Sequence, residues 1–260
     1  MGGALFIFCL LLVFIRCEIL LRLYGRFRPS ELQKFISDLH PTTGRKLFFL
    51  AGMFAGVRAE FERYRGPLPP VFLIISNHQT LADIPALTLV FHRRQLRFVA
   101  KKSLGHWIPY VSTNLRWGGH ALISRTGDYR EGQQELRRFA DLSREGICPA
   151  VFPEGTRSRS GRIGEFFTGA VRIILERSPM PVMSVAIDGG YRIATLARLL
   201  GNLHGTHYRI RPLTLYPAPH GKKEITELLT KVREEIVDQV GQWRKSNLPR
   251  GPRVPFSFRA

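Results

Sequence analysis

Two residues suited to acid–base chemistry, His78 and Asp83, stand five positions apart directly after an apolar run. An aspartate that accepts the proton on one ring nitrogen of a histidine fixes the tautomer, which leaves the other nitrogen free to take a proton from a hydroxyl. On a continuous helix this spacing rotates two side chains about 140° apart, so the pair can meet only if His78 lies in a turn. The alternative is that His78 caps a strand and Asp83 caps a helix that runs through Pro85.

Two further clusters place an arginine where an apolar run ends. The segment 118–125 ends with Arg125, and the segment 151–158 brings Pro, Glu, Gly and Arg together. Arg125 and Arg157 can each bind phosphate oxygens through two parallel hydrogen bonds, and Gly155 lets backbone amides come close to an anion. Taken singly, either cluster also fits a solvated loop. Taken together with the histidine and the aspartate, they favour a site.

These clusters need a scaffold that brings the strand ends together. Short apolar runs alternate with helical patterns from residue 71 onward, which predicts an α/β fold with a largely parallel sheet flanked by helices. In such sheets ligands gather outside the carboxyl ends of the strands, where the clusters fall. The predicted strands are residues 71–76, 96–100, 120–124, 147–152 and 180–187 and one at Tyr208, and helices are predicted after Tyr129, after Phe166 and, with an amphipathic pattern, from Ile225 to Trp243.

The N-terminal part of the chain contains two apolar segments. Residues 2–15 carry no charge but are shorter than the roughly 20 residues that span a bilayer, and they lack the basic start and cleavage site of a signal peptide. Residues 47–57 carry Gly52 and Gly56 at the four-residue spacing that lets two helices pack closely. We therefore expect a helical hairpin that dips into one leaflet at the cytoplasmic face of a membrane, monotopic or anchored by its N-terminus. For residues 47–57 alone, a core helix with a solvated face fits equally well.

Charged and stiff segments set the expected boundaries. The basic residues between the two apolar segments include Arg22, Arg26, Arg28 and Lys34, each worth about 1 kcal/mol near anionic headgroups. The proline-rich run 65–70 predicts a boundary between an N-terminal membrane-associated helical segment, 1–66, and an α/β domain, 67–245. Residues 246–260 are predicted to be a basic flexible tail. After the last predicted helix, which ends at Trp243, the chain has no acid and contains Arg244, Lys245, Arg250, Arg253 and Arg259.

Composition limits the classes of function. Lys and Arg number 39 against 20 Asp and Glu, a net charge of +19 that favours nucleic acid, an anionic bilayer or phosphorylated substrates as partners. No nucleic-acid-binding motif appears, so nucleic acid is not expected, and a basic membrane- or nucleic-acid-binding protein without catalysis is the remoter alternative. The Gly-x-Ser-x-Gly elbow of serine hydrolases is missing too. Three cysteines without paired spacing fit packing roles in a reducing compartment, and His204 and His207 lack a third ligand, so no metal is expected.

Four segments in order resemble the motifs of a known family. They are N-H-Q-T-L-A-D at 77–83, the strand that ends in Arg125, F-P-E-G-T-R-S at 152–158 and M-P-V-M-S-V at 180–185. In order and spacing they resemble the four motifs of the glycerolipid (PlsC-type) acyltransferases, and most closely those of the 1-acylglycerol-3-phosphate acyltransferases. The resemblance covers residues 70–190 approximately and includes the segment 100–109 between the first two motifs.

The resemblance implies an enzyme that moves a fatty acyl group from a thioester to the free hydroxyl of a lysophospholipid, chiefly 1-acylglycerol-3-phosphate, to give phosphatidic acid. It implies that His78 is the general base and that Asp83 orients it. The residues implied for the acceptor and its phosphate are Asn77, Arg125, Glu154, Gly155, Thr156 and Arg157. The co-substrate would be acyl-CoA or an acyl carrier protein, with no other cofactor. Backbone amides near the His78 turn are the expected donors to the tetrahedral oxyanion.

Two positions depart from the family pattern. Phe167 stands where members carry the lysine of a Phe-Lys pair, and Ser184 stands where they carry the second proline of the fourth motif. The first departure removes a cation near the predicted phosphate. Either Arg159 or Arg162 replaces that charge, or the acceptor is a different lysolipid whose phosphate already bears a headgroup.

Overall fold

The computed structural model describes residues 2–106, 108–124, 128–195, 197–198 and 205–246, and the backbone of residues 256–259. Within them the strands are β1 (Arg58–Glu62), β2 (Leu73–Ser76), β3 (Gln95–Lys101), β4 (Ala121–Ile123), β5 (Ile147–Val151), β6 (Val182–Asp188), β7 (His207–Tyr216) and β8 (Phe256–Arg259). They form one sheet in the order β4-β3-β5-β2-β6-β7-β1-β8. The paired strands are parallel except for β6 and β7. The predicted α/β fold with a largely parallel sheet is confirmed.

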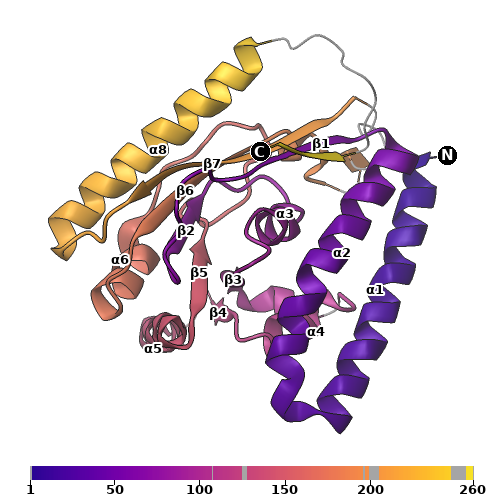
Figure 1. Ribbon diagram of the computed structural model, residues 1–260, viewed down its shortest axis with the longest axis horizontal. Helices are drawn as coiled ribbons and strands as arrows, with labels where there is room; N and C mark the ends of the chain where they lie inside the picture. The colour runs from indigo at the N-terminus through magenta and orange to yellow at the C-terminus, as the bar shows by residue number, and fades with distance from the viewer. Residues whose placement is uncertain are drawn as a thin grey trace.

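Helices cover both faces of this sheet, as Figure 1 shows. The helices are α1 (Gly2–Phe27), α2 (Leu32–Ala55), α3 (Asp83–Val90), α4 (Val111–Trp117), α5 (Tyr129–Asp141), α6 (Thr168–Arg177) and α8 (Gly221–Lys245), with short 3-10 turns η1 (Pro29–Glu31), η2 (Lys102–Gly105), η3 (Leu142–Glu145) and η4 (Gly190–Ile193). The α1–α2 hairpin and α3 lie on one side of the sheet, and α5, α6 and α8 lie on the other. The five strands predicted from residue 71 to residue 187 agree with β2–β6 within two residues at either end.

Strand β2 is buried on both faces, which is why its sequence is a continuous apolar run. Alternate side chains of a strand point to opposite faces. Ile74 packs into the cluster that contains Phe48 of α2 and Leu87 of α3. Leu73 and Ile75 pack into the opposite cluster, beneath α5, α6 and α8. The strand that leads to His78 is therefore held from both sides.

Helix α8 confirms its predicted amphipathic pattern. Its buried side chains are the seven apolar residues at three- and four-residue steps, namely Ile225, Leu228, Leu229, Val232, Ile236, Val240 and Trp243. This stripe docks on the sheet and leaves the polar face of the helix at the surface. Arg244 and Lys245 belong to this helix, so they are not part of a flexible tail.

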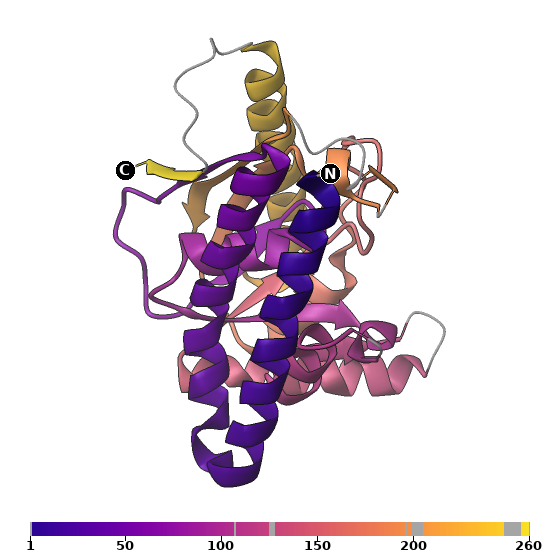
Figure 2. The same ribbon diagram turned by 90° about the vertical axis from the view of Figure 1, so that its right-hand side faces the viewer.

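The two N-terminal helices form the predicted hairpin and lie side by side in Figure 2. Helix α1 extends past the apolar run to Phe27 and is long and apolar enough to cross a membrane by length and composition. Glu18 breaks the run without facing solvent, because it accepts hydrogen bonds from the backbone N–H of Tyr110 (2.9 Å) and the hydroxyl of Thr113 (2.9 Å). Gly56 lies just past the end of α2, where it adopts a left-handed conformation with φ 65°.

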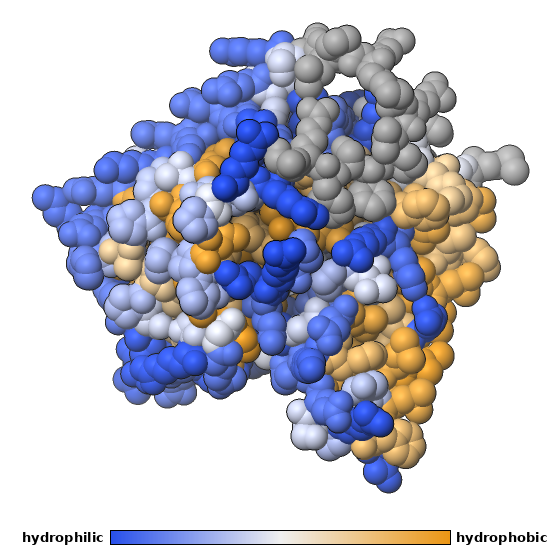
Figure 3. Space-filling model, viewed as in Figure 1, coloured by the Kyte–Doolittle hydropathy of each residue, from blue (hydrophilic) through white to orange (hydrophobic). Residues whose placement is uncertain are grey.

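The outer face of the hairpin is apolar. Figure 3 shows hydrophobic residues over this side of the molecule. The exposed large apolar side chains of α1 and α2 are Leu5, Phe8, Leu11, Leu12, Ile15, Ile19, Leu23, Phe27, Phe49 and Met53. An exposed patch of this kind marks a surface that meets lipid or another protein.

The predicted boundary at residue 245 coincides with the end of α8, whereas the segments outside the two predicted boundaries each contribute a strand to the sheet. Strand β1, at residues 58–62, pairs with β7 and β8, so a boundary at residue 66 cuts through the sheet. In β1 charged residues alternate with apolar ones, so this segment lacks the apolar run that predicts a buried strand. Residues 256–259 of the predicted flexible tail form β8, and residues 247–255 lie outside the described residues.

Ser184, the second departure from the family pattern, lies at an irregularity in the pairing of β6 with β7. Its hydroxyl donates to the carboxylate of Glu235 on α8 (2.6 Å) and accepts from the backbone N–H of Thr214 (3.0 Å). A proline ring offers neither contact. The serine therefore joins β6, β7 and α8 at this point.

Candidate active site

His78 lies in the turn between the end of β2 and the start of α3, as the sequence argument required. Its Nδ1 is 2.8 Å from Oδ2 of Asp83. The imidazole stacks on the ring of Phe152 at a centroid distance of 4.1 Å, and its side chain keeps 14% of its surface exposed. Because Nδ1 donates to the carboxylate, Nε2 carries the free lone pair, and no other described residue hydrogen-bonds to Nε2. A neutral imidazole held this way can accept a proton from a bound hydroxyl.

Asp83 is fully buried and is held by more than the histidine. The backbone N–H groups of Gln79 and Thr80 donate to Oδ2 at 2.6 and 2.9 Å. The hydroxyl of Tyr208, on β7, donates to Oδ1 at 2.8 Å. A buried carboxylate needs such donors, and here they also fix the plane of the carboxylate that faces His78. Sequence reasoning missed Gln79 and Tyr208, because nothing in the local pattern marks a tyrosine on a distant strand.

Glu154 joins the His78 turn to the loop that follows β5. One carboxylate oxygen accepts from the backbone N–H of His78 (2.8 Å), and the other accepts from the N–H of Gly164 (2.9 Å). The pKa of this carboxyl group is raised, because the effect of burial exceeds that of the two backbone hydrogen bonds, which lower it. Glu154 therefore positions the two loops, which differs from the phosphate contact predicted for it.

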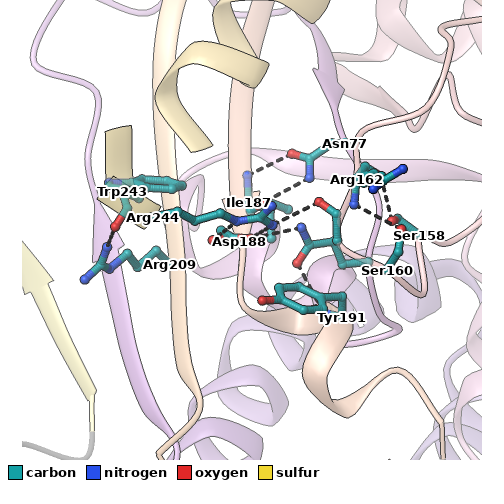
Figure 4. A network of polar contacts seen from close by, with 12 residues as sticks. Asn77, Ser158, Ser160, Arg162, Ile187, Asp188, Tyr191, Arg209, Trp243 and Arg244 are labelled. Carbon is teal, nitrogen blue, oxygen red and sulfur yellow. Dashed lines mark hydrogen bonds and ion pairs between the residues drawn. The ribbon is translucent and has the colours of Figure 1, made fainter. Parts of the chain in front are cut away.

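Asn77 also connects two segments. Its side-chain amide donates to the carbonyl of Ile187 (2.8 Å) and accepts from the N–H of Ile187 (2.9 Å), as Figure 4 shows. Asn77 is 1% exposed, so its side chain is taken up by the end of β6. This places Asn77 in support of the turn, not against the substrate as predicted.

The 152–158 turn presents its arginine to solvent. Gly155 adopts φ 62°, which glycine tolerates, and the N–H of Ser158 donates to the carbonyl of His78 (2.8 Å), so this turn is tied to the His78 turn. Thr156 and Arg157 are exposed, and the guanidinium of Arg157 pairs with no other described residue. Arg125 lies outside the described residues.

An apolar cavity of about 380 Å³ opens next to these turns, between the hairpin and helices α3 and α4. Its lining includes Arg157 and the segment 80–82 that follows His78. The apolar lining comes from both N-terminal helices and from α3 and α4, with Phe6, Leu10, Phe14, Leu47, Phe48, Ile84, Pro85, Val111 and Leu115 among the residues. A cavity of this size and character suits a small apolar ligand or a hydrocarbon chain.

Polar side chains also reach this cavity, and they satisfy one another. Asn114 donates to Nε2 of His40 (2.7 Å) and accepts from Nε2 of His120 (3.0 Å). Burial, reinforced by the charge of Arg97, lowers the pKa of His40 to about 4 and that of His120 well below its usual value. Both imidazoles are therefore neutral.

The sequence predicts no metal site, and only the described residues bear on this prediction. Among them, no group of three or more His, Cys, Asp and Glu side chains could hold a metal ion. Nε2 of His207 lies 2.9 Å from the carboxylate of Glu60, and His204 lies outside the described residues.

Comparisons with known proteins agree with the site. The sequence model of the Acyltransferase family matches residues 64–188. A chloroplastic 1-acyl-sn-glycerol-3-phosphate acyltransferase of Arabidopsis thaliana is 33% identical over 166 residues, which cover 64% of this chain and 44% of the relative. A protein of the same name from Chlamydomonas reinhardtii is 28% identical over 187 residues, covering 69% and 51%. This chain thus spans about half the length of these two relatives.

A solved structure shares the whole fold. The crystal structure of the 1-acyl-sn-glycerophosphate (LPA) acyltransferase PlsC from Thermotoga maritima superposes with a TM-score of 0.72 at 21% identity, covering 96% of this chain and 97% of that one. The sheet, the hairpin and the His78 turn define an α/β protein of the acyltransferase class. Residues 64–188 match the acyltransferase family, and the chain is similar to acyltransferases of the glycerolipid, PlsC type.

Proposed function

We propose that this protein is a membrane-associated O-acyltransferase that moves a fatty acyl group from a thioester to the free hydroxyl of 1-acylglycerol-3-phosphate, giving phosphatidic acid. The observation that carries the proposal is the His78–Asp83 pair, 2.8 Å apart, beside an apolar cavity whose lining includes Arg157. A base, an apolar cavity and a cation that pairs with no other described residue are three features that suit this reaction. The names of the relatives and the fold of PlsC support the same substrate class.

The chemistry follows from the geometry of His78. The acceptor oxygen attacks the thioester carbonyl carbon while its proton passes to Nε2, and Asp83 stabilises the imidazolium that forms. When the tetrahedral intermediate collapses, the C–S bond breaks and the thiolate receives the proton from His78. The products are the new ester and the free thiol, so histidine returns to its neutral form. This sequence of steps uses no metal and no cofactor beyond the thioester co-substrate.

The oxyanion of the intermediate needs donors other than those expected from the sequence. The N–H groups of His78, Gln79 and Thr80 all donate to the carboxylates of Glu154 and Asp83. These three amides are therefore occupied, and they serve to hold the turn. The oxyanion donors must come from a different part of the site.

Arg157 is the described residue best placed to bind the acceptor phosphate. It is exposed, it pairs with no other described residue, and it stands in a turn tied to His78 through Ser158. An arginine can bind two phosphate oxygens at once, and a phosphate monoester offers nearly two negative charges. We assign Arg125 the same role from its place in the second motif. Gly155 and Thr156 lie beside Arg157 in the turn.

The acyl chain and the donor follow from the cavity and the charge. The apolar lining of the cavity matches a fatty acyl chain, whose thioester end would lie near His78. Acyl-CoA and acyl carrier protein are both anionic, and a net charge of +19 favours the approach of either donor.

Membrane association follows from the hairpin. Its outer face exposes ten large apolar side chains, and the cavity for the acyl chain lies against its inner face. The four predicted headgroup-binding residues are exposed around the connection between the two helices, namely Arg22, Arg26, Arg28 and Lys34. We propose that the hairpin enters one leaflet at the cytoplasmic face, so that lipid substrates reach the site without leaving the bilayer.

Phe167 favours a second acceptor. It is 63% exposed at the start of α6, where the family pattern has a lysine, and its backbone N–H donates to the carbonyl of Pro153 (3.0 Å). Without that cation, a monoester has fewer positive partners. A lysolipid whose phosphate bears a headgroup is therefore the alternative acceptor.

The test is an acyl-transfer assay with the full chain in anionic vesicles, using lysophosphatidic acid and lysolipids bearing choline, ethanolamine or glycerol headgroups, each with acyl-CoA and with acyl carrier protein. We expect lysophosphatidic acid to give the highest kcat/KM. A protein that ignores lysophosphatidic acid but acylates a headgroup-bearing lysolipid would establish the second acceptor. A protein that acylates no lysolipid with either donor would contradict the proposal.

A further inference from the structure

Two arginines of helix α8, Arg233 and Arg244, contact the loop at residues 159–164, which directly follows the Arg157 turn. They are eleven residues apart, a spacing that places two side chains within about 20° of each other around a helix. We propose that Arg233 and Arg244 are positioning residues that hold this loop, and that Arg244 also holds the His78 turn through Asp188 and Gln79. Their effect on acyl transfer rests on the proposed function.

Both arginines donate to carbonyl oxygens of the loop. Nε of Arg233 lies 2.7 Å from the carbonyl oxygen of Gly164. A terminal nitrogen of Arg244 lies 2.9 Å from the carbonyl oxygen of Gly161. Gly161 adopts φ 79°, and a Cβ there would come within 2.9 Å of Arg244 and 2.8 Å of Tyr191. The loop therefore approaches α8 closely at a position where only glycine fits.

Arg244 makes a second set of contacts at the end of β6, drawn in Figure 4. Its Nε and a terminal nitrogen lie 3.1 and 2.5 Å from the two carboxylate oxygens of Asp188. Its guanidinium also lies over the ring of Tyr191, 5.2 Å from the centroid. Pairing with Asp188 raises the pKa of Arg244, and the buried carboxylate gains its counter-ion.

Asp188 connects Arg244 to the His78 turn. Asp188 accepts a hydrogen bond from the side-chain amide of Gln79 (3.3 Å). The side-chain oxygen of Gln79 accepts from the N–H of Tyr191 (3.2 Å), and the backbone N–H of Gln79 donates to Asp83 (2.6 Å). A continuous series of hydrogen bonds thus runs from the last turn of α8 to the carboxylate that orients His78.

Besides the two arginines, the loop is held by Gly164, whose N–H donates to Glu154, by Arg198, which donates to the carbonyl of Arg159, and by short-range bonds of Ser158 and Ser160 to Arg162. Residues 155, 161 and 164 are glycines, which lose the most conformational freedom on ordering, and most of the loop is exposed. Helix α8 is already anchored by seven buried apolar residues. The side chain of Arg244 is 39% exposed, so its ion pair adds little to global stability. The main consequence of these arginines is local order next to Arg157 and His78.

The contacts predict different effects for the two arginines. Arg233→Gln should free the loop alone, raising the KM for the lysolipid about fivefold with kcat nearly unchanged. Arg244→Gln should raise the same KM and also lower kcat about tenfold, because the His78 turn loses its support. Arg244→Lys keeps the charge beside Asp188 but cannot also reach Gly161, so it should restore kcat more than KM. Lys231→Gln, on an exposed part of α8, is the matched control.

The deciding measurement does not need activity. Amide hydrogen exchange should become about tenfold faster across residues 158–164 in both Arg233→Gln and Arg244→Gln, and across residues 77–80 in Arg244→Gln alone. Exchange that matches the wild type, or that matches Lys231→Gln, would overturn the proposal. If the wild type acylates no lysolipid, the proposed function fails while exchange still decides the role of the arginines.

A double variant tests the route through Asp188. If Arg244 acts through Asp188, then Asp188→Asn should lower kcat by about the same factor as Arg244→Gln, and the double variant should lose little more. If kcat of the double variant fell by the product of the two single factors, the two residues would act separately, and this result would overturn the route through Asp188. In all variants an unchanged melting transition would exclude general unfolding as the cause.

Discussion

The hydroxyl of Tyr208 donates a 2.8 Å hydrogen bond to Oδ1 of Asp83, which lies 125 residues earlier in the chain. Both side chains are fully buried. Burial, together with the charge of Asp83, raises the pKa of Tyr208 well above its usual value, so the hydroxyl stays a donor throughout the pH range of an enzyme assay. The carboxylate that orients His78 is thus held by β7, which lies two positions from β2 in the sheet.

Removing this hydroxyl should therefore weaken catalysis without removing the base. Tyr208→Phe keeps the ring that packs 5.2 Å from the ring of Phe48 but leaves Asp83 with one donor fewer. We expect kcat to fall about tenfold with KM nearly unchanged, and the free energy of unfolding to fall by about 2 kcal/mol. Steady-state kinetics and chemical denaturation measure the two effects. A change in KM alone would show that Tyr208 does not act through Asp83.

The buried histidines predict how stability depends on pH. The pKa of His40 is lowered from its ordinary 6.5 to about 4 by burial and by the charge of Arg97. Above pH 6.5 neither the folded nor the unfolded state binds this proton. Between pH 6.5 and pH 4 only the unfolded state binds it, so stability should fall as the pH falls, by about 1.4 kcal/mol per pH unit for each such group.

His40→Gln should flatten this dependence. The glutamine oxygen can still accept from Asn114, so the fold should remain while one titrating group is lost. Free energies of unfolding measured at pH 7 and pH 5 would check this. An identical pH slope in wild type and variant would mean that the pKa of His40 is the same in the folded and unfolded states.

Arg157 should control binding of the acceptor and leave the chemical step alone. Arg157→Gln should raise the KM for lysophosphatidic acid about tenfold or more, equivalent to about 1.4 kcal/mol, with a smaller change in kcat. Phe167→Lys should then lower that KM, because it adds a cation where the family pattern has one, and Phe167→Leu is its control. If Phe167→Lys only shifts preference from a headgroup-bearing lysolipid toward lysophosphatidic acid, the second acceptor is correct.

The hairpin should hold the protein on membranes through apolar contacts. Deleting it would also remove Phe48, Ala51 and Ala55 from the core, so substitution on its outer face is the cleaner test. Leu12→Asp with Ile19→Asp should reduce binding to anionic vesicles at least about tenfold, since each aspartate costs a few kcal/mol in the bilayer. Val237→Asp, at an exposed apolar position of α8, is the control. Release of the wild type by high salt alone would show that basic charge dominates instead.

The features that could be predicted from the sequence are local ones. The strand before His78 is a continuous apolar run because both its faces are buried, and the five-residue offset to Asp83 requires a turn. Helix α8 follows its 3.6-residue period over its whole length. In each case the signal and the structure lie within the same short segment.

The features that could not be predicted depend on residues far apart. Strand β1 has alternating charges whose partners lie on β7, as with Glu62 and Arg211 at 2.6 Å. Glu154 looked like part of a phosphate site, yet its oxygens accept from the backbone of His78 and Gly164. Arg244 looked like part of a basic tail, yet it pairs with Asp188. No local pattern shows these partners, since they become neighbours only after the sheet has formed.

The most direct test of the account is the rate of phosphatidic acid formation by His78→Ala in anionic vesicles, beside the wild type and the exposed-histidine control His220→Ala. We predict that His78→Ala lowers kcat by about a thousandfold, in line with the loss of a general base, while its melting transition and its binding to vesicles stay as in the wild type. The control should keep the wild-type rate. A His78→Ala protein that remains folded and retains kcat within about tenfold of the wild type would contradict the assignment of His78 as the base.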